Sequence, residues 1–269
     1  MNAHPAQPQV IRTPRYSVRW ALELLWILGS HRINLRYKET LLGFGWIFLQ
    51  PVSMTVIFNY IHKVARIPSG DVPYPLFMAT GFVAWTFTAM VVSQTVVSVT
   101  GYTAVLKRIA LPRILLPFSA LLAVLADVGI MGILLIGLLL YYKFAVPATI
   151  VWVPVIFFIH FSLLVGLSCL VSLANVFLRD VGHGIPQLLQ LWFFASPVFY
   201  PSSLVPEEFR LLSLWNPMTG IIEGYRSILL LGRPPPWDLL WPATIVTAVI
   251  LLGGLLCFRH LEGTIADML

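Results

Sequence analysis

The segment LRDVGHGIPQLLQLWFFASPVFYPSSLVP, residues 178–206, organises the rest of this chain. A charged, glycine-flanked turn precedes Pro186, and the apolar, aromatic-rich run that follows breaks at Pro197 and Pro201. Proline suits the first turn of a helix, whereas a proline within or after the run kinks or ends it. The pattern predicts a membrane helix that starts beside Pro186 in a cytosolic loop and stops early at the far side. Short, broken membrane helices often mark a solute path.

The composition is that of an integral membrane protein. Hydrophobic residues make up 58% of the chain and charged residues 10%, and the mean hydropathy is +0.86. Such values lie outside the range of soluble globular proteins. The net charge of +6 does not indicate nucleic-acid binding, because no basic block is interleaved with stacking aromatics. The two cysteines, Cys169 and Cys257, lie in apolar runs at a spacing that suggests neither a disulfide framework nor a metal site.

Six segments are long enough to cross a bilayer, which takes about 20 apolar residues. We therefore expect an all-α integral membrane protein with six transmembrane helices. Residues 1–15 lack an apolar signal segment and are expected to form a flexible cytosolic tail. Residues 32–269 are expected to form the membrane domain. The six predicted spans are residues 42–61, 75–99, 114–142, 150–178, 185–201 and 239–258.

The segment 16–31 is predicted to be an amphipathic helix lying in the membrane interface. Arg15, Arg19 and Glu23 recur every four residues and form one polar stripe among large apolar residues. The uncharged run after Glu23 is too short to span a bilayer. A helix buried against the other spans is the alternative.

The basic residues predict the orientation, because cytosolic loops carry an excess of Lys and Arg. With the N-terminus inside, both termini are cytosolic, and 11 of the 17 Lys and Arg residues lie on that side. The cytosolic set is Arg12, Arg15, Arg19, Arg32, Arg36, Lys38, Lys107, Arg108, Arg113, Arg179 and Arg259, and the outer set is Lys63, Arg66, Lys143, Arg210, Arg226 and Arg233.

The outer connection at residues 202–237 is too long for an ordinary loop. Pro206 with Glu207 and Glu208 is typical of a helix start, and Asn216-Pro217 is typical of a second one. Two short re-entrant or interfacial helices are therefore expected at about residues 203–232. Glu223 and Arg226 lie at i, i+3 on the second of them, where an ion pair forms easily.

The sequence lacks the common catalytic motifs. It contains no G-x-x-x-x-G-K-[ST], no H-E-x-x-H and no G-x-S-x-G, so it offers no nucleotide loop, helical metal pair or nucleophile elbow. We expect no catalytic residue, no metal site and no cofactor in this chain. Any energy for its work comes from elsewhere.

Three features inside the predicted spans are candidates for function. Asp127 is an acid within a long apolar run, and we favour a structural contact in the bundle over proton coupling. His160 is likewise interpreted as a satisfied polar contact. The aromatics after Pro186 admit two readings, because rings can pass the apolar C–H faces of sugars but also pack at membrane interfaces. These aromatics are Trp192, Phe193, Phe194, Phe199 and Tyr200.

Several motifs in order along the chain are similar to those of permease subunits of ATP-binding-cassette polysaccharide exporters, of the O-antigen, teichoic-acid and capsular-glycan type. The resemblance covers roughly residues 36–226. It is carried by RYKETLLG at 36–43 with Trp46 and LQP at 49–51, VPYP at 72–75, PRILLP at 112–117, Arg179-Asp180, Leu191-Trp192, SPVFYP at 196–201, and NPM at 216–218.

This resemblance implies a homodimer of six-span subunits in a bacterial cytoplasmic membrane, with the channel at the dimer interface. Two copies of a separate ATPase subunit would bind ATP and Mg²⁺ and drive export of a lipid-linked glycan. By the same resemblance, the channel residues are the five aromatics above with Trp46, the ATPase-coupling residues are Arg19, Glu23, Lys107, Arg108, Arg179 and Asp180, and the outer gate includes Asn216, Pro217, Glu223 and Arg226.

Two other functions remain open at this point. A transporter of the same superfamily could export drugs or lipids. A polytopic glycan-lipid enzyme would need a carboxylate cluster, and Glu207-Glu208 is the acidic doublet available outside. That doublet is explained more simply as charge at a helix start.

Overall fold

The computed structural model describes residues 17–38, 45–65, 72–106, 111–144 and 147–268. The regular elements in these ranges are helices, as predicted. Among the described residues, four helical segments are long and apolar enough to cross a membrane, and they match four of the six predicted spans. They are α3 (Tyr74–Val96), α5 (Leu115–Tyr141), η2 with α6 (Ala148–Trp152 and Val153–Phe177), and the part Trp237–Thr264 of α10 (Trp237–Met268).

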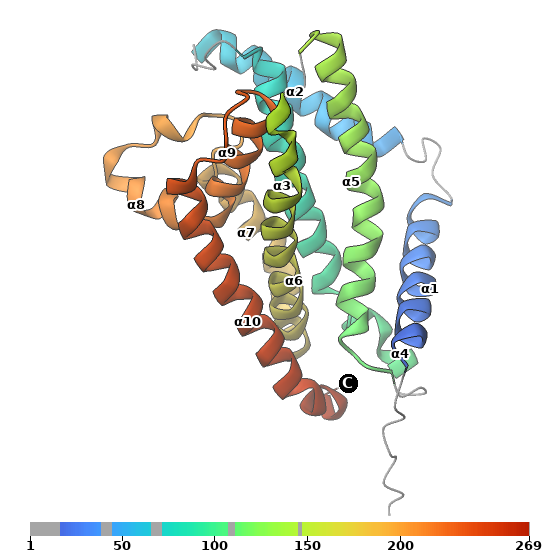
Figure 1. The fold of residues 1–269 in the computed structure, drawn as a ribbon. Helices are drawn as coiled ribbons and strands as arrows, with labels where there is room; N and C mark the ends of the chain where they lie inside the picture. Colours follow the sequence, from blue (N-terminus) through green and yellow to red (C-terminus); the bar gives the residue numbers. More distant parts are fainter. Residues whose placement is uncertain (1–16, 39–44, 66–71, 107–110, 145–146, 269) are drawn as a thin grey trace, which may run out of the picture.

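The bundle has two ends, which we name after their short helices. The α4 end is where α3 finishes and α5 begins, next to η1 (Thr100–Tyr102) and α4 (Thr103–Leu106). The α8 end is where α3 begins and α5 finishes, and it carries α8 (Glu207–Trp215) and α9 (Pro217–Leu229). Figure 1 shows that α10 finishes at the α4 end, where α1 (Val18–Tyr37) begins.

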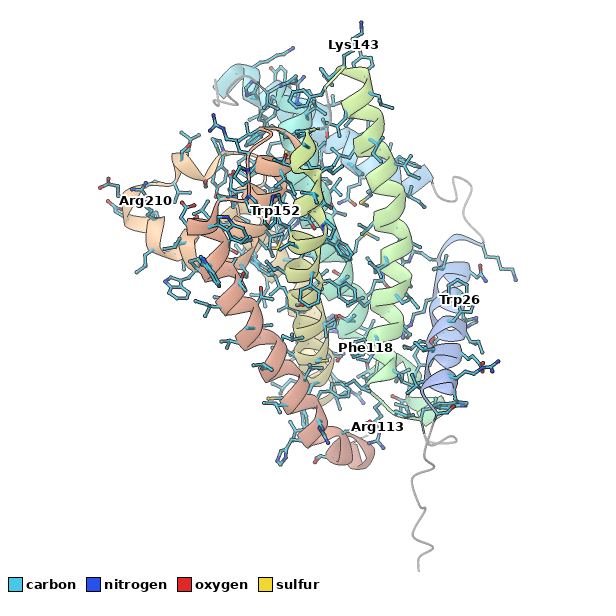
Figure 2. All side chains as sticks on the ribbon, in the orientation of Figure 1. Trp26, Arg113, Phe118, Lys143, Trp152 and Arg210 are labelled. Carbon is cyan, nitrogen blue, oxygen red and sulfur yellow. The ribbon has the colours of Figure 1, made fainter. Side chains whose placement is uncertain are left out.

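Three basic residues lie at the ends of the bundle that the predicted orientation requires, whereas Arg36 of the cytosolic set pairs with Asp127 halfway along α5. Figure 2 shows Arg113 at the α4 end, while Lys143 lies beyond the far end of α5 and Arg210 on α8. The backbone N–H of Arg113 donates to Glu262 Oε1 on α10 at 2.9 Å. This contact joins the start of α5 to the last turns of the chain.

The other two predicted spans take different forms. The first corresponds to α2 (Gly45–Ala65), which Figure 1 shows lying across the bundle near the α8 end at a steep angle to α5. The fifth corresponds to α7 (Asp180–Ala195), whose 16 residues rise about 24 Å. That length is shorter than the hydrocarbon core of a bilayer, about 30 Å. Neither α2 nor α7 is therefore among the described helices that are long and apolar enough to cross a membrane.

The predicted start of α7 at Pro186 is wrong, because the helix begins six residues earlier at Asp180 and contains Pro186. The side-chain oxygen of Asn175 accepts the backbone N–H of Gly182 at 2.9 Å. This bond, with a second one of 3.2 Å to the carbonyl of Arg179, satisfies a first-turn donor, so the helix can begin before the proline. Gly182 leaves room for it, since a Cβ there would lie 2.9 Å from Asn175 Oδ1.

Two glycines set the distance between α6 and α10. A Cβ on Gly166 would lie 2.6 Å from the carbonyl oxygen of Ile250, and one on Gly254 would lie 2.4 Å from the carbonyl oxygen of Gly166. Small residues let membrane helices approach backbone to backbone. The close crossing holds α10 against the centre of the bundle.

Helix α1 extends to Tyr37, beyond the predicted boundary at residue 31, and packs alongside α5 (Figure 1). Arg36 forms an ion pair with the fully buried Asp127 of α5, and Arg32 donates to the carbonyl of Ser98 at 3.5 Å. The helix contacts α5, but large apolar side chains such as Trp26 stay exposed, so it is not buried as the alternative for this helix requires. Asp127 has a partner within the bundle, as the structural interpretation of this residue predicted.

Candidate functional site

The turn between α7 and α8, residues 196–201, is bound by the side chain of Arg226 on α9. Its Nη1 donates to the carbonyl of Pro197 at 2.6 Å, and its Nη2 donates to the carbonyl of Val198 at 2.6 Å. Its Nε donates to the carbonyl of Phe77 on α3 at 3.3 Å. One guanidinium therefore joins α9, the turn and α3.

Arg226 is buried, with only 1% of its surface exposed. Its guanidinium carbon lies 3.5 Å from the centroid of the Phe77 ring, and its Nη1 lies 3.2 Å from Glu223 Oε1. An arginine stays charged in proteins, and the Glu223 carboxylate and the three backbone carbonyls compensate that charge in the interior. The predicted Glu223–Arg226 pair thus forms in the interior, where a charge needs such partners.

Glu223 and Gly81 complete the surroundings of this arginine. Glu223 Oε1 also accepts the backbone N–H of Ser202 at 3.0 Å, which ties α9 to the residue after the turn. A Cβ on Gly81 would lie 2.6 Å from Arg226 Nη2 and 2.7 Å from the carbonyl oxygen of Val198. A side chain at position 81 of α3 would block this contact, so the glycine allows the arginine to reach the turn.

Asn216 joins the start of α9 to the end of α7. Its Oδ1 caps α9 by accepting the N–H of Met218 at 3.1 Å, and it also accepts the indole N–H of Trp192 at 3.0 Å. Its Nδ2 donates to Ser196 Oγ at 3.0 Å. Pro217 is buried at the first position of the helix, where a proline loses no hydrogen bond.

Three predicted channel aromatics pack between α2, α3 and α7. Phe193 contacts Trp85 edge to face with ring centroids 5.6 Å apart, and Trp192 does the same at 5.5 Å. Phe199 lies 4.9 Å from the ring of Phe58 on α2. Their offset and edge-on arrangements are those that aromatic pairs favour in a protein core.

The other predicted aromatics lie further out. Phe194 is 53% exposed, and its carbonyl accepts the hydroxyl of Tyr200 at 3.2 Å. Both residues line a cleft of about 400 Å³ against Phe209 and Leu212 of α8. The side chain of Trp46 lies outside the described residues.

A second cleft, of about 360 Å³, lies between α2, α3 and α7. We name it the amide cleft, because Gln50, Gln94 and Gln190 line it together with the rings of Trp85 and Phe193. Phe193 is the predicted channel aromatic that faces it. Gln50 belongs to the LQP motif at 49–51, whereas Gln94 and Gln190 lie in none of the motifs on which the resemblance rests.

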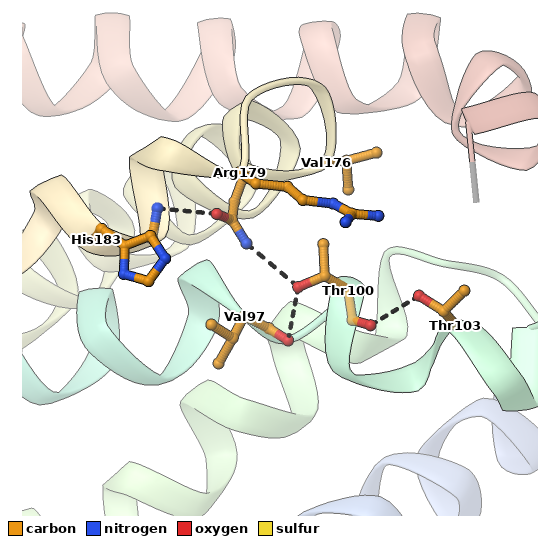
Figure 3. A pocket seen from close by; sticks show the side chains of 8 residues that line it. Val97, Thr100, Thr103, Val176, Arg179 and His183 are labelled. Carbon is orange, nitrogen blue, oxygen red and sulfur yellow. Dashed lines mark hydrogen bonds between the residues drawn. The ribbon is translucent and has the colours of Figure 1, made fainter.

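At the α4 end, the start of α7 meets the end of α3 in a cleft of about 350 Å³ (Figure 3). Arg179 and His183 line it together with Asn175, whose side-chain amide donates to Thr100 Oγ1 at 3.2 Å. Asp180 is exposed in the first turn of α7. The structure thus brings the predicted coupling turn beside η1.

The remaining predicted coupling residues are less constrained. Arg19 and Glu23 form an ion pair at 2.9 Å on the exposed face of α1, with 89% and 59% of their side chains exposed. Lys107 and Arg108 lie outside the described residues.

The acids Glu207 and Glu208 are exposed in the first turn of α8, where carboxylates interact favourably with the helix dipole.

His160 is buried, and the predicted polar contact forms at one ring nitrogen only, because its Nδ1 has no hydrogen-bond partner among the described residues. Its Nε2 lies 2.8 Å from Thr88 Oγ1, between the rings of Phe87 and Tyr225.

No group of three His, Cys, Asp or Glu side chains that could hold a metal ion occurs in the part of the chain that the structure describes. Cys169 is buried and Cys257 is exposed, and both are free thiols.

A family model described as "ABC-2 type transporter" matches residues 23–230 of this chain. The chain belongs to the ABC-2 type transporter family. It is 24% identical to the O-antigen export system permease protein RfbA of Klebsiella pneumoniae, over 95% of this chain and 98% of that protein. It is 28% identical to the RfbA protein of Myxococcus xanthus, over 91% and 94% of the two chains. It is 22% identical to the polysialic acid transport protein KpsM of Escherichia coli, over 87% and 92%.

The ABC-2 match runs from within α1 to just past the end of α9. It therefore includes the Arg226 network, both clefts beside α7 and the cleft at Arg179, whereas α10 lies beyond it. Sequence reasoning missed Phe77 and Gly81 in this region. The glycine within an apolar helix was the available signal, because such a glycine often marks a close approach.

Proposed function

We propose that this chain is the permease subunit of an exporter that carries a lipid-linked polysaccharide across the bacterial cytoplasmic membrane. The observation that carries the proposal is the likeness to RfbA of K. pneumoniae over 95% of this chain. The printed names of the relatives refer to O-antigen export and polysialic acid transport, which both concern saccharide polymers. Membership of the ABC-2 family implies an ATP-binding partner subunit.

In this proposal the chain has six spans, with both termini in the cytosol. Helix α2 is the first span, and α7 with the turn after it is the fifth. Two hydrogen bonds at opposite ends of α3 support the fifth span. Asn175, just before α7, bonds to Thr100 after α3. Tyr74, at the start of α3, donates to the carbonyl of Phe199 in the turn after α7 at 2.9 Å, so α7 and the turn together run the length of α3. The turn therefore supplies length that the 16-residue helix lacks.

Helices α8 and α9 form the outer gate of the proposed transporter as re-entrant elements. No residue of α8 is buried, whereas most of α9 is, so the two helices differ in how firmly they are held. Asn216, Glu223 and Arg226 fix α9 to the turn and its neighbours, and Pro217 is buried at the start of α9. Helix α8 packs more loosely over the cleft at Phe194 and Tyr200. Movement of α8 on a fixed α9 would open that cleft.

The energy comes from two copies of a separate ATPase subunit that bind ATP and Mg²⁺, and this chain itself needs no cofactor. The exposed start of α7, with Arg179 and Asp180, and the exposed pair Arg19–Glu23 provide charged surface for that partner. Lys107 and Arg108 would belong to the same surface. A second copy of this chain would complete the channel.

The proposed path follows α7. Phe193 lines the amide cleft, whereas Phe194 and Tyr200 line the cleft under α8, so aromatic rings occur on both sides of the helix. Rings can contact the apolar C–H faces of many sugars without binding any one of them tightly. An exporter of drugs or lipids is the second candidate, since the ABC-2 family name states no substrate.

Cells that lack this chain provide the test. We expect them to lose their surface polysaccharide, to accumulate the lipid-linked form inside and to recover on expression of the wild-type chain. Expression of a Phe194→Ala variant should change the amount or length of exported polysaccharide without changing the amount of assembled complex. Normal surface polysaccharide together with increased sensitivity to amphiphilic drugs would favour the second candidate instead.

A further inference from the structure

Three glutamines from three helices converge on the amide cleft. Gln50 belongs to α2, Gln94 lies near the end of α3, and Gln190 lies in the second half of α7. Along α3 the lining extends from Phe82 to Gln94, about 18 Å at the usual rise per residue. The cleft is therefore longer than one sugar ring.

These amides lack partners within the described part of the chain. Gln50 and Gln190 are exposed, Gln94 is half-buried, and none of the three makes a hydrogen bond to a described residue. An amide side chain has two donor hydrogens and an acceptor oxygen. Leaving such groups in hydrocarbon is costly, so a face that carries three of them is suited to water or to a polar ligand.

The chemistry of the cleft favours an uncharged, hydroxylated ligand. Amides both donate and accept, as sugar hydroxyls do, and the ring of Trp85 beside them suits the C–H face of a sugar. Ser93 adds a further hydroxyl to the wall. No charged residue occurs among the described residues that line the cleft, so it offers no counter-ion to a phosphate or to a cationic drug.

We infer that the amide cleft is a sugar-contacting wall of the transport path, in which Gln50, Gln94 and Gln190 exchange hydrogen bonds with the hydroxyls of a passing glycan. This inference rests on the proposed function and adds the residues that contact the sugar. Each amide makes weak, replaceable bonds, which lets a polymer move past without being held.

The first arm of the test asks whether water reaches the cleft, and it needs no glycan. The chain is purified with its ATPase subunit in a Cys257→Ser background, reconstituted in phosphatidylethanolamine and phosphatidylglycerol vesicles, and treated with a charged methanethiosulfonate. Gln50→Cys, Gln94→Cys and Gln190→Cys should react about tenfold faster than Val249→Cys on the exposed apolar face of α10, because a thiolate forms where water reaches the sulfur.

The second arm measures export of surface polysaccharide from cells. Gln94→Leu and Gln190→Leu should each slow export about two- to tenfold, the change expected from one lost hydrogen bond. Gln187→Leu is the matched control for Gln190→Leu, because Gln187 is also exposed on α7 but does not line the cleft. Gln190→Asn keeps the amide and should restore part of the rate. Basal ATPase activity of the purified Gln187→Leu complex should stay the same.

The two arms of the test distinguish failure of the sugar contacts in the amide cleft from failure of the proposed export function. Cysteines in the cleft that are as unreactive as Val249→Cys would overturn the inference, because the cleft would then be filled by protein or lipid. Reactive cysteines with normal export in the leucine variants would overturn the sugar contacts and leave the proposed function intact. Equal loss of export in Gln187→Leu would indicate packing and overturn the specific role. Absence of polysaccharide export by the wild-type chain would instead defeat the proposed function, while the cysteine arm still decides whether the cleft holds water.

Discussion

The two ends of the bundle use their polar residues in opposite ways. At the α8 end, Arg226 and Asn216 are directed inward and donate hydrogen bonds to carbonyls and a side chain of residues 196–201. At the α4 end, Arg179 and Asp180 lie exposed around an open cleft. The first arrangement fixes the shape of the turn, and the second leaves charge available to a partner. Substitutions should therefore cost stability at the α8 end and coupling at the α4 end.

The largest effect is expected from Arg226→Leu. This change removes the donor to two turn carbonyls and leaves Glu223 without its ion-pair partner in a poorly hydrated place. Breaking a buried pair by removing one member costs about 3–5 kcal/mol. The melting temperature of the purified chain in detergent should fall accordingly, and Arg226→Lys should rescue little, because a lysine lacks the planar fork.

The matched control for this variant is Arg210→Leu on α8. Arg210 is exposed and makes no described contact with the turn, so its loss should leave the melting temperature unchanged. Equal stability of the Arg226→Leu and Arg210→Leu variants would mean that the turn is held by other contacts.

Gly81→Ala should produce the next largest effect. The added methyl group would lie 2.6 Å from Arg226 Nη2 and 2.7 Å from the carbonyl oxygen of Val198, so one of them must move. Overpacking of this kind costs about 1–3 kcal/mol. Thermal unfolding measures it, with Gly132→Ala on α5 as the control.

At Gly132 a Cβ meets nothing within 4 Å, so alanine should be neutral or stabilise the helix by up to about 1 kcal/mol. The two glycine variants thus differ in the sign of their effect. If both behaved alike, the contact between α3 and the turn would not be as close as described.

Asp180→Arg should impair coupling with only a small loss of stability. Asp180 is exposed in the first turn of α7, so reversal of its charge disturbs no buried contact and costs at most about 1 kcal/mol at the helix dipole, but it changes the surface that the proposed ATPase partner would meet. We expect polysaccharide export to fall several-fold while the melting temperature falls only slightly and ATP hydrolysis continues. Unchanged export would remove the α7 start from the coupling surface.

The smallest effect is expected from the double variant Arg19→Ala/Glu23→Ala. The pair is exposed on α1, and exposed pairs of this kind contribute little to stability. The melting temperature should not change measurably, and export should fall less than for Asp180→Arg. A loss of stability as large as that of Gly81→Ala would show that this pair is structural.

The sequence predicted the helical class and four spans well, because long apolar runs such as the one in α5 have few alternatives to a helix in a membrane. It predicted the starts of α8 and α9 from local residue chemistry. It placed the start of α7 six residues late, because the side chain that caps its first turn, Asn175, belongs to the preceding helix.

The site could be predicted only in part. The spacing of Glu223 and Arg226 indicated an ion pair, but the same spacing occurs on surfaces and in cores, so the burial of Arg226 could not be read from it. The pair Arg36–Asp127 joins residues 91 positions apart, and no local pattern connects them. The convergence of three glutamines likewise depends on how α2, α3 and α7 pack.

Affinity purification of this chain from its native membranes tests the central claim most directly. The account predicts that a nucleotide-binding subunit is purified with it, that the complex hydrolyses ATP, and that lipid-linked polysaccharide is found in the preparation. A stable preparation with no ATPase subunit and no ATP hydrolysis would contradict the assignment of this chain as the permease subunit of an ATP-driven exporter.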